Sequence, residues 1–323
     1  MQYLLILALH LFMPNVNVNP PTCSDTLQFE RVKLDGVGCM MTGGAGDQSL
    51  TVASIDFDKK DTILLTAVIY RNNAVYKKLE GYSYADFLDD NTLIAVDPDG
   101  HPWRYHLATQ QREKYITDLP IENISGPDLN VRKWKGALGL MVRMDSAVLF
   151  QGVQEQHAKK ILQLQQLQGL NKDFNAIVSF DVYGDKILTV LKSNDEGEDK
   201  THFEVCYWDG SKASSLYHFT AIGDGDAMPV ARFAGADQYF LSFNEMWGRI
   251  QLNSIQEKKV GPLFCTDSAL VKNMAYQNGQ LYCELMTTII PPTEQTMAAL
   301  VRATFSRVNI HKVLNKFDIK RSK

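Results

Sequence analysis

The sequence lacks the short motifs that mark the commonest catalytic and nucleotide-binding sites. Neither GxSxG nor HExxH occurs among the 323 residues, so no nucleophile elbow and no zinc-protease helix is expected. The glycine-rich run at residues 36–46 contains neither GxGxxG nor the GxxxxGK motif, and no helix signal follows it, which excludes a nucleotide-binding loop. None of the five cysteines belongs to a CxxC pair, so neither a structural zinc site nor a thioredoxin-like centre is predicted.

The chain also lacks an excess of basic charge and, after its first residues, any long apolar run. Its formal net charge is −4 and its pI is about 6.0, which argues against nucleic acid as a partner because phosphate binding requires a basic surface. No stretch beyond residue 13 is long and apolar enough to cross a bilayer, so the chain is not expected to be transmembrane. The contents of 45% hydrophobic and 22% charged residues are those of a globular protein.

An apolar run at residues 3–13 has the length of a signal-peptide core. No Lys or Arg precedes it and no small-x-small cleavage site follows, but it is too short to span a membrane. We expect residues 1–22 to be a signal peptide with a polar, proline-rich linker. Residues 23–323 would then be one domain of a secreted or cell-surface protein. A buried N-terminal strand or helix is the alternative.

In a secreted chain the five cysteines allow at most two disulfides. Cys23 and Cys39 both flank the N-terminal entry, and we predict that they pair. In a cytosolic chain all five would be unreactive core thiols. The triplet that begins at Asn123 is a glycosylation sequon, so Asn123 is a predicted glycosylation site.

Residues 202–222 are predicted to form a β-hairpin. Aromatic and β-branched residues alternate at 203–208, Asp209-Gly210 supplies a tight turn, and a second apolar run follows at 216–222. His202 and His218 lie on this hairpin and are expected to be close together, as interstrand partners rather than as catalysts.

Similar groups of four short strands recur along the chain. Their final turns centre near Asn72, Thr109, Gln154, Asp209, Ser254 and Arg307, with separations of 37, 45, 55, 45 and 53 residues. This spacing resembles that of the β-propeller superfamily, in which a four-stranded blade takes about 40–50 residues. The resemblance covers residues 27–317 and implies an all-β, six-bladed propeller of four-stranded antiparallel blades. No WD, kelch or Asp-box signature repeats, so no specific family is indicated. The alternative fold is a pair of β-sandwich domains.

Three segments carry further predictions. Residues 27–34 alternate like a strand and are expected to pair with the last blade, which would close the ring. Residues 311–317 are expected to form the fourth strand of that blade. Residues 154–170 are rich in helix formers and fit neither period, so they are predicted to be a strand, with an inserted helix as the alternative.

Acidic residues gather in the loops that join second to third strands and successive blades, which lie on one face of a propeller. This face, which we call the acidic loop face, would attract a basic partner or a hard cation. The predicted binding residues are Asp97, Asp99, Asp195, Glu196, Glu198, Asp199, Asp224, Asp226 and Trp247. The alternative reading is that these Asp residues serve turn geometry.

No cofactor is predicted, because calcium needs about six converging oxygens and the EF-hand loop pattern is missing. Calcium remains the alternative. The sequence nominates no catalytic residue. It favours a non-catalytic propeller that binds a protein or a glycan. The alternative is a propeller hydrolase, either metal-dependent and lactonase-like or acting on glycosides.

Overall fold

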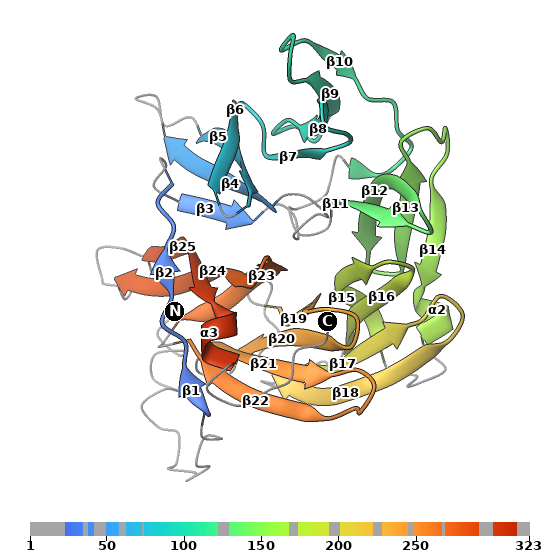
Figure 1. Cartoon of the computed structure of the whole chain (residues 1–323). Coiled ribbons are helices and arrows are strands. Elements are labelled where there is room, and N and C mark those ends of the chain that lie inside the picture. Colours follow the sequence, from blue (N-terminus) through green and yellow to red (C-terminus); the bar gives the residue numbers. More distant parts are fainter. Residues whose placement is uncertain are drawn as a thin grey trace, which may run out of the picture.

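Six β-sheets are arranged in a ring around a central axis, and each sheet is one blade of a six-bladed β-propeller (Figure 1). The predicted fold is therefore confirmed. The computed structural model describes residues 23–34, 38–41, 50–57, 63–72, 74–121, 129–167, 174–193, 201–221, 228–244, 248–266, 269–290 and 300–314.

The first three blades follow one another along the chain, each running from the inner strand to the outer strand. Blade 1 contains β3 (Gly38–Met41), β4 (Leu50–Phe57), β5 (Ile63–Arg71) and β6 (Ala74–Glu80). Blade 2 contains β7 (Tyr84–Phe87), β8 (Thr92–Val96), β9 (Pro102–His106) and β10 (Arg112–Lys114). Blade 3 contains β11 (Leu129–Trp134), β12 (Ala137–Met144), β13 (Ala147–Gly152) and β14 (Lys159–Gln163).

The last three blades continue this order, and the N-terminal residues complete the final two. Blade 4 contains β15 (Phe174–Tyr183), β16 (Lys186–Ser193), β17 (Thr201–Trp208) and β18 (Ala213–Ala221). Blade 5 contains β19 (Val230–Phe233), β20 (Gln238–Asn244), β21 (Gly248–Ser254), β22 (Val260–Cys265) and, at its edge, β1 (Asp25–Thr26). Blade 6 contains β23 (Leu270–Gln277), β24 (Gln280–Ile290), β25 (Leu300–Asn309) and β2 (Glu30–Arg31).

The predicted hairpin at residues 202–222 is β17 paired with β18. One carboxylate oxygen of Asp209 accepts hydrogen bonds from the backbone N–H groups of Ser211 and Lys212, at 2.8 and 2.7 Å. These bonds lower the pKa of Asp209, the bond from Lys212 having the largest effect. Gly210 adopts a φ of 98°, a conformation that side chains with a Cβ disfavour. The Asp-Gly pair therefore forms the turn that its chemistry predicts.

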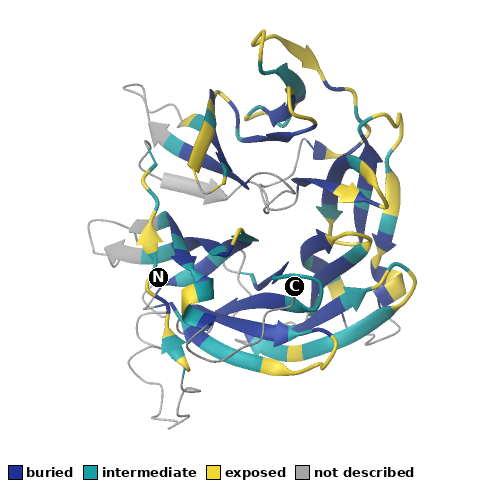
Figure 2. Ribbon diagram, viewed as in Figure 1, coloured by how far each residue is buried: buried dark blue, intermediate teal, exposed yellow. Residues whose placement is uncertain are grey.

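Apolar side chains pack between adjacent blades, so the core is divided into six clusters. Figure 2 shows where the buried residues lie along the strands. The cluster between blades 6 and 1 is aromatic: Tyr70 and Tyr282 lie 5.4 and 5.5 Å from the ring of Phe305, between centroids. Each blade packs both of its faces against its neighbours, which explains why β7, β8 and β19 are buried along their whole length.

Residues 23–34 form a segment, here called the N-terminal strap, that runs across the outer edges of blades 5 and 6. β1 pairs in parallel with β22, and β2 pairs in antiparallel with β25. Between them Leu27, 2% exposed, inserts into the core between the two blades. The expectation that residues 27–34 pair with the last blade is confirmed.

The fourth strand predicted at residues 311–317 is wrong. Residues Ile310–Leu314 form a short helix, α3, and 315–317 lie outside the described residues. The outer position of blade 6 is taken by β2 instead. The apolar residues Ile310 and Leu314 are four positions apart, so both face the core from one side of a helix. In a strand, successive side chains of this segment would instead point alternately to opposite faces.

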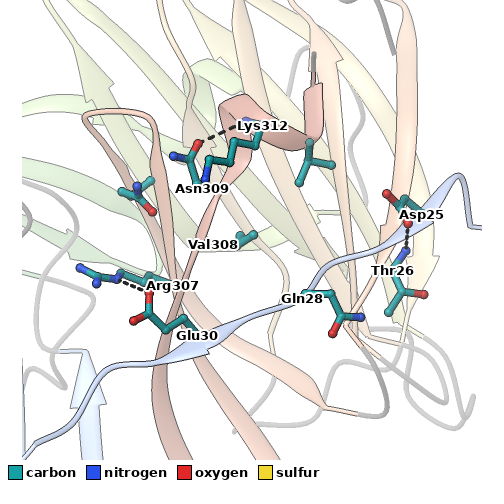
Figure 3. Close-up of a pocket in the computed structure, with 10 residues that line it drawn as sticks. Asp25, Thr26, Gln28, Glu30, Arg307, Val308, Asn309 and Lys312 are labelled. Atoms are coloured by element: carbon teal, nitrogen blue, oxygen red, sulfur yellow. Dashed lines mark hydrogen bonds and ion pairs between the residues drawn. The ribbon is translucent and has the colours of Figure 1, made fainter. Parts of the chain in front are cut away.

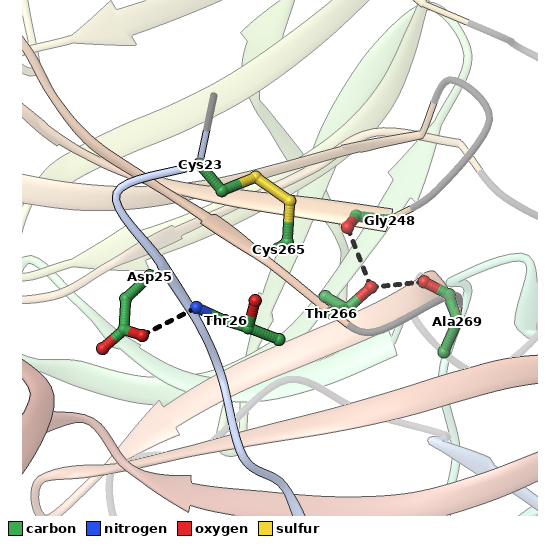
Figure 4. The surroundings of a disulfide bond; sticks show 7 residues. All are labelled: Cys23, Asp25, Thr26, Gly248, Cys265, Thr266 and Ala269. Carbon is green, nitrogen blue, oxygen red and sulfur yellow. Dashed lines mark hydrogen bonds between the residues drawn. A yellow bond between two sulfur atoms is a disulfide. The ribbon is translucent and has the colours of Figure 1, made fainter. Parts of the chain in front are cut away.

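The predicted pairing of Cys23 with Cys39 is also wrong. Cys23 bonds with Cys265, the last residue of β22, with the two Cα atoms 5.8 Å apart (Figure 4). The partners are separated by 242 residues in the sequence. The N-terminal strap brings them together, because Ser24 N–H donates to the carbonyl of Leu263 and β1 pairs with the end of β22, where Thr26 lies opposite Cys265. Cys206 and Cys283 are buried free thiols.

The segment at residues 154–170 contains both the predicted strand and the helix that was its alternative. β14 forms the outer strand of blade 3, and a single helical turn, α2 (Leu164–Leu167), follows it. Leu164 and Leu167 are buried between blades 3 and 4, which explains why the apolar residues follow neither period throughout. Residues 168–170 lie outside the described residues.

Replacing Cys23 or Cys265 with serine is expected to lower the free energy of unfolding by about 2–5 kcal/mol, because the disulfide restricts the unfolded chain over a very long loop. Urea unfolding under non-reducing conditions measures this change. The double variant should lose no more than either single variant, since all three lack the same bond. Peptide mapping without reductant should recover Cys23 linked to Cys265, and recovery of a Cys23–Cys39 peptide would contradict the structure.

Candidate functional site

The inner strands carry buried charges that bind across the blades rather than projecting into solvent. Arg132 on β11 donates from Nη2 to Oδ1 of Asp181 on β15, at 3.2 Å. The other carboxylate oxygen of Asp181 accepts the backbone N–H of Phe233 on β19, at 2.9 Å. One carboxylate therefore connects blades 3, 4 and 5. Both side chains of this ion pair are at most 10% exposed.

Arg232 on β19 is the second connecting residue, and it is 2% exposed. Its Nη1 donates to the carbonyl of Phe180 at 2.9 Å and to Ser179 Oγ at 3.1 Å, both in blade 4. Its Nε donates to the carbonyl of Met274 at 2.9 Å, and Nη2 donates to Oδ1 of Asn273 at 3.0 Å, both in blade 6. Blades 4, 5 and 6 are separate sheets with no backbone ladder between them, and the guanidinium of Arg232 supplies hydrogen bonds between them instead.

Single hydrogen bonds join blades 2 and 3 and blades 1 and 2. The Tyr84 hydroxyl on β7 accepts the backbone N–H of Val131 on β11, at 3.1 Å. Burial, and then the nearby charge of Asp86, raise the pKa of Tyr84, so this hydroxyl stays neutral. Thr51 Oγ1 donates to the carbonyl of Ala85, which joins blades 1 and 2. These hydrogen bonds and the ion pair therefore link neighbouring blades.

The described part of the acidic loop face is the turn between β8 and β9. Oδ1 of Asp97 accepts the backbone N–H groups of Asp99 and His101 at 3.1 and 2.8 Å, and Oδ2 accepts Trp103 Nε1 at 3.0 Å. The Nδ1 of His101 lies 3.4 Å from Oδ2 of Asp97. The ligating atoms of Asp97, Asp99 and His101 all lie within 4.8 Å of one another.

Partial burial raises the pKa of Asp97, but the hydrogen bonds from Trp103, His101 and Asp99 and the charge of His101 outweigh it, so the pKa is lowered. The carboxylate of Asp97 is therefore ionised, and its hydrogen bonds hold the turn in place. Asp99 and His101 extend from this turn, Asp99 being exposed and His101 about half-exposed in its side chain. Two of the predicted binding residues, Asp97 and Asp99, are thus brought together.

The remaining predicted site residues lie outside the described residues. The described part of the chain does not include Asp195, Glu196, Glu198, Asp199, Asp224, Asp226, Trp247 or the sequon residue Asn123. Within the same described ranges, no helix is both long enough and apolar enough to cross a membrane.

The structure does bring together the two histidines of the β17–β18 hairpin. The rings of His202 and His218 stack at 5.8 Å between centroids. The expectation that they are neighbours on adjacent strands is confirmed.

Sequence reasoning missed a pocket of about 610 Å³ between the N-terminal strap and the end of β25 (Figure 3). The Nε of Arg307 donates to Oε2 of Glu30 at 3.1 Å across it, and these residues are 277 positions apart. The lining residues are Asp25, Thr26, Gln28, Glu30, Gln280, Arg307, Val308, Asn309, Lys312 and Val313. No local pattern signals this pocket, because it exists only where the two ends of the chain meet.

No family model and no curated protein matches the chain. Among solved structures it is similar to U3-55K, with 9% sequence identity and a TM-score of 0.51 over 87% of this chain and 98% of that one. It also matches BamB from Moraxella catarrhalis, with 11% identity and a TM-score of 0.42 over 87% of this chain and 96% of that one. At these identities the similarity to U3-55K concerns the fold alone.

Replacing Asp181 with asparagine is expected to lower the free energy of unfolding by about 3–5 kcal/mol, because Arg132 would keep a buried charge without its partner. Asparagine is chosen because it retains an acceptor for the N–H of Phe233. Chemical denaturation measures the loss. Combining it with Arg132→Met should recover part of the stability, and simple additivity of the two single losses would contradict the ion pair.

The turn at Asp97 predicts a dependence on pH. Because the pKa of Asp97 is lowered on folding, its contribution to stability is present above its unfolded pKa of about 3.9 and is lost as the pH falls through the folded value. The stability difference between wild type and Asp97→Asn should therefore be constant above about pH 5 and shrink below about pH 4. Urea unfolding across this range measures it. Asp90→Asn removes an exposed carboxylate and controls for net charge. A difference that grows on acidification would contradict the assignment.

Proposed function

We propose that this chain is a secreted or surface-displayed propeller that binds a basic protein surface through its acidic loop face and performs no chemistry of its own. The proposal is supported mainly by the fact that these charged residues of the inner strands bond to groups in neighbouring blades. Arg132 pairs with Asp181, and Asp181 and Arg232 also bond to backbone groups of other blades, so these charges stabilise the fold. Recognition is then left to the loops, the part of a rigid fold that most often carries it.

The charge of the loops supports a basic partner. At the β8–β9 turn, Asp97 holds the backbone so that Asp99 is presented to solvent. The sequence adds Asp195, Glu196, Glu198, Asp199, Asp224 and Asp226 in connections of the same kind, with Trp247 as an aromatic anchor. Clustered carboxylates of one sign raise the association rate of a positively charged partner.

The disulfide supports a location outside the cytosol, since such bonds persist in oxidising compartments. The proposal accordingly includes a signal peptide and linker at residues 1–22, a single propeller domain at 23–323, and glycosylation at Asn123.

The turn at Asp97 does not favour calcium as a resident ion. It offers two carboxylates and one imidazole, whereas calcium takes six to eight oxygen ligands. Both oxygens of Asp97 already accept N–H groups.

A glycan partner and a lactonase-like or glycoside-acting hydrolase are the alternatives, and the experiment below separates them.

The chain is produced with residues 1–22 in place, recovered from the medium with its disulfide intact, and used to capture partners from cell-surface and extracellular fractions. The purified partner is then titrated against a loop variant. That variant carries Asp195→Asn, Glu196→Gln, Glu198→Gln and Asp199→Asn. We expect its affinity to fall by about tenfold or more and its salt dependence to weaken.

The matched control removes the same charge from connections at the opposite ends of the strands. It carries Asp90→Asn, Asp185→Asn, Asp237→Asn and Glu257→Gln. This control should bind like the wild type. Equal losses in both variants would overturn the role of the acidic loop face. A captured glycan in place of a protein would replace the partner class, and hydrolytic turnover with a stoichiometric metal would favour the enzyme.

A further inference from the structure

The outer strand of each blade is an open sheet edge, and the six edges of this ring differ in how they are protected. An exposed edge presents unpaired N–H and C=O groups to other chains, and proteins block it with very short strands, charges or proline. The outer strands of blades 2, 5 and 6 contain three, two and two residues. Those of blades 1 and 3 each carry two lysines. All of these edges are therefore protected.

The outer strand of blade 4, β18, has none of these protections. It is nine residues long, and its sequence ASSLYHFTA contains no lysine, arginine, aspartate, glutamate or proline. It lies at the rim of the ring, and no strand among the described residues pairs with its outer side (Figure 1). The helical turn α2 contacts β18, but Leu164 and Leu167 of that turn pack in the core between blades 3 and 4. α2 therefore packs against a face of blade 4 and leaves the edge without a ladder.

The last part of β18 is a regular strand. A β-bulge in its pairing with β17, between Val205 and Cys206, leaves Leu216 as the extra residue, and the register is unbroken from Tyr217 to Ala221. The pairings of β6 and β14 contain bulges too, so this irregularity does not distinguish β18 from the protected edges. A further strand can add to residues 217–221 without interruption.

Phe219, the middle residue of this regular stretch, belongs to a row of aromatic rings that crosses the strands. Its ring stacks on Phe203 of β17 at 5.5 Å and on Tyr217 at 5.6 Å, between centroids, and lies 5.7 Å from the ring of Phe243 in blade 5. Phe219 is only partly buried. Because aromatic residues directly opposite each other stabilise paired strands, an added strand with an aromatic residue opposite Phe219 extends this row.

We propose that β18 is a dimerisation edge, at which residues 217–221 of two copies of this chain pair in antiparallel about a two-fold axis at Phe219. The axis places Phe219 opposite its counterpart in the second copy, so the chain itself supplies the aromatic residue that extends the row. His218 then lies opposite Thr220 of the second copy. Because neither edge carries lysine, arginine or an acidic residue, the two copies meet without the like-charge repulsion that lysines would cause at blades 1 and 3.

Charges placed at the pair of His218 and Thr220 test both the dimer and its register. One variant carries His218→Lys and Thr220→Lys, and a second carries His218→Glu and Thr220→Glu. Sedimentation velocity of the folded, disulfide-intact wild type between about 1 and 100 µM should show a dimer. Each variant alone should dimerise at least about tenfold more weakly, since like charges then lie directly opposite. An equimolar mixture of the two should form a heterodimer, because every introduced lysine faces a glutamate.

The matched control carries Val75→Lys and Gln163→Lys, since both side chains are exposed on the outer strands of blades 1 and 3. It adds two lysines at other edges and should dimerise like the wild type. Circular dichroism should be the same for all variants, because His218 is exposed and Thr220 partly so. The proposal is overturned if the wild type stays monomeric, if the lysine and glutamate variants dimerise like the wild type, if the control loses the dimer equally, or if the mixture forms no heterodimer.

Discussion

The closure of the ring by the N-terminal strap is the contact on which the rest of this structure depends. Blades are separate sheets, so between them no backbone ladder resists opening. The strap adds strands to blades 5 and 6 from a segment that continues into blade 1, and Cys23–Cys265 fixes its beginning. It also covers parts of two sheet edges, which exposed would pair with other chains. One segment thus provides closure, edge protection and one wall of the pocket.

The polar groups of the inner strands connect the blades on the inside of the ring, as the N-terminal strap connects blades 5 and 6 at their outer edges. Arg232 reaches both neighbouring blades, and Asp181 is shared by blades 3 and 5. Such buried charges are costly unless fully partnered, so each fixes the positions of the blades that supply its partners.

Much of the architecture could be predicted from the sequence because blade spacing and turn chemistry are local. Asp209-Gly210 is an example: both the Asp cap and the positive φ of Gly210 follow from the residues themselves. What failed was long-range. Residues 27–34 were expected to pair with the last blade, but the outer position that β2 occupies in that blade was assigned to residues 311–317. The partner of Cys23 lies 242 residues away, and the two meet only because the N-terminal strap lies along β22.

The candidate binding residues show the same division. The turn at Asp97 could be predicted because Asp-Pro-Asp-Gly has an intrinsic turn preference. Its sequence does not reveal that the carboxylate of Asp97 accepts three N–H groups and lies beside the ring of His101. The pocket beside Glu30 and Arg307 could not be predicted at all, since it needs both ends of the chain in place.

The β17–β18 hairpin unites these themes, because its two ends have different chemistry. At the turn, the carboxylate of Asp209 is bound by its own backbone, so that end is fixed by local sequence. At the other end, His202 and His218 meet only because the register places Glu204 opposite His218. A shift of one residue would move these side chains to opposite faces. The turn sets the register as far as Cys206, which lies opposite Ser215, and a β-bulge between Val205 and Cys206 then shifts the pairing so that Glu204 lies opposite His218. The turn and the bulge together bring the two imidazoles side by side.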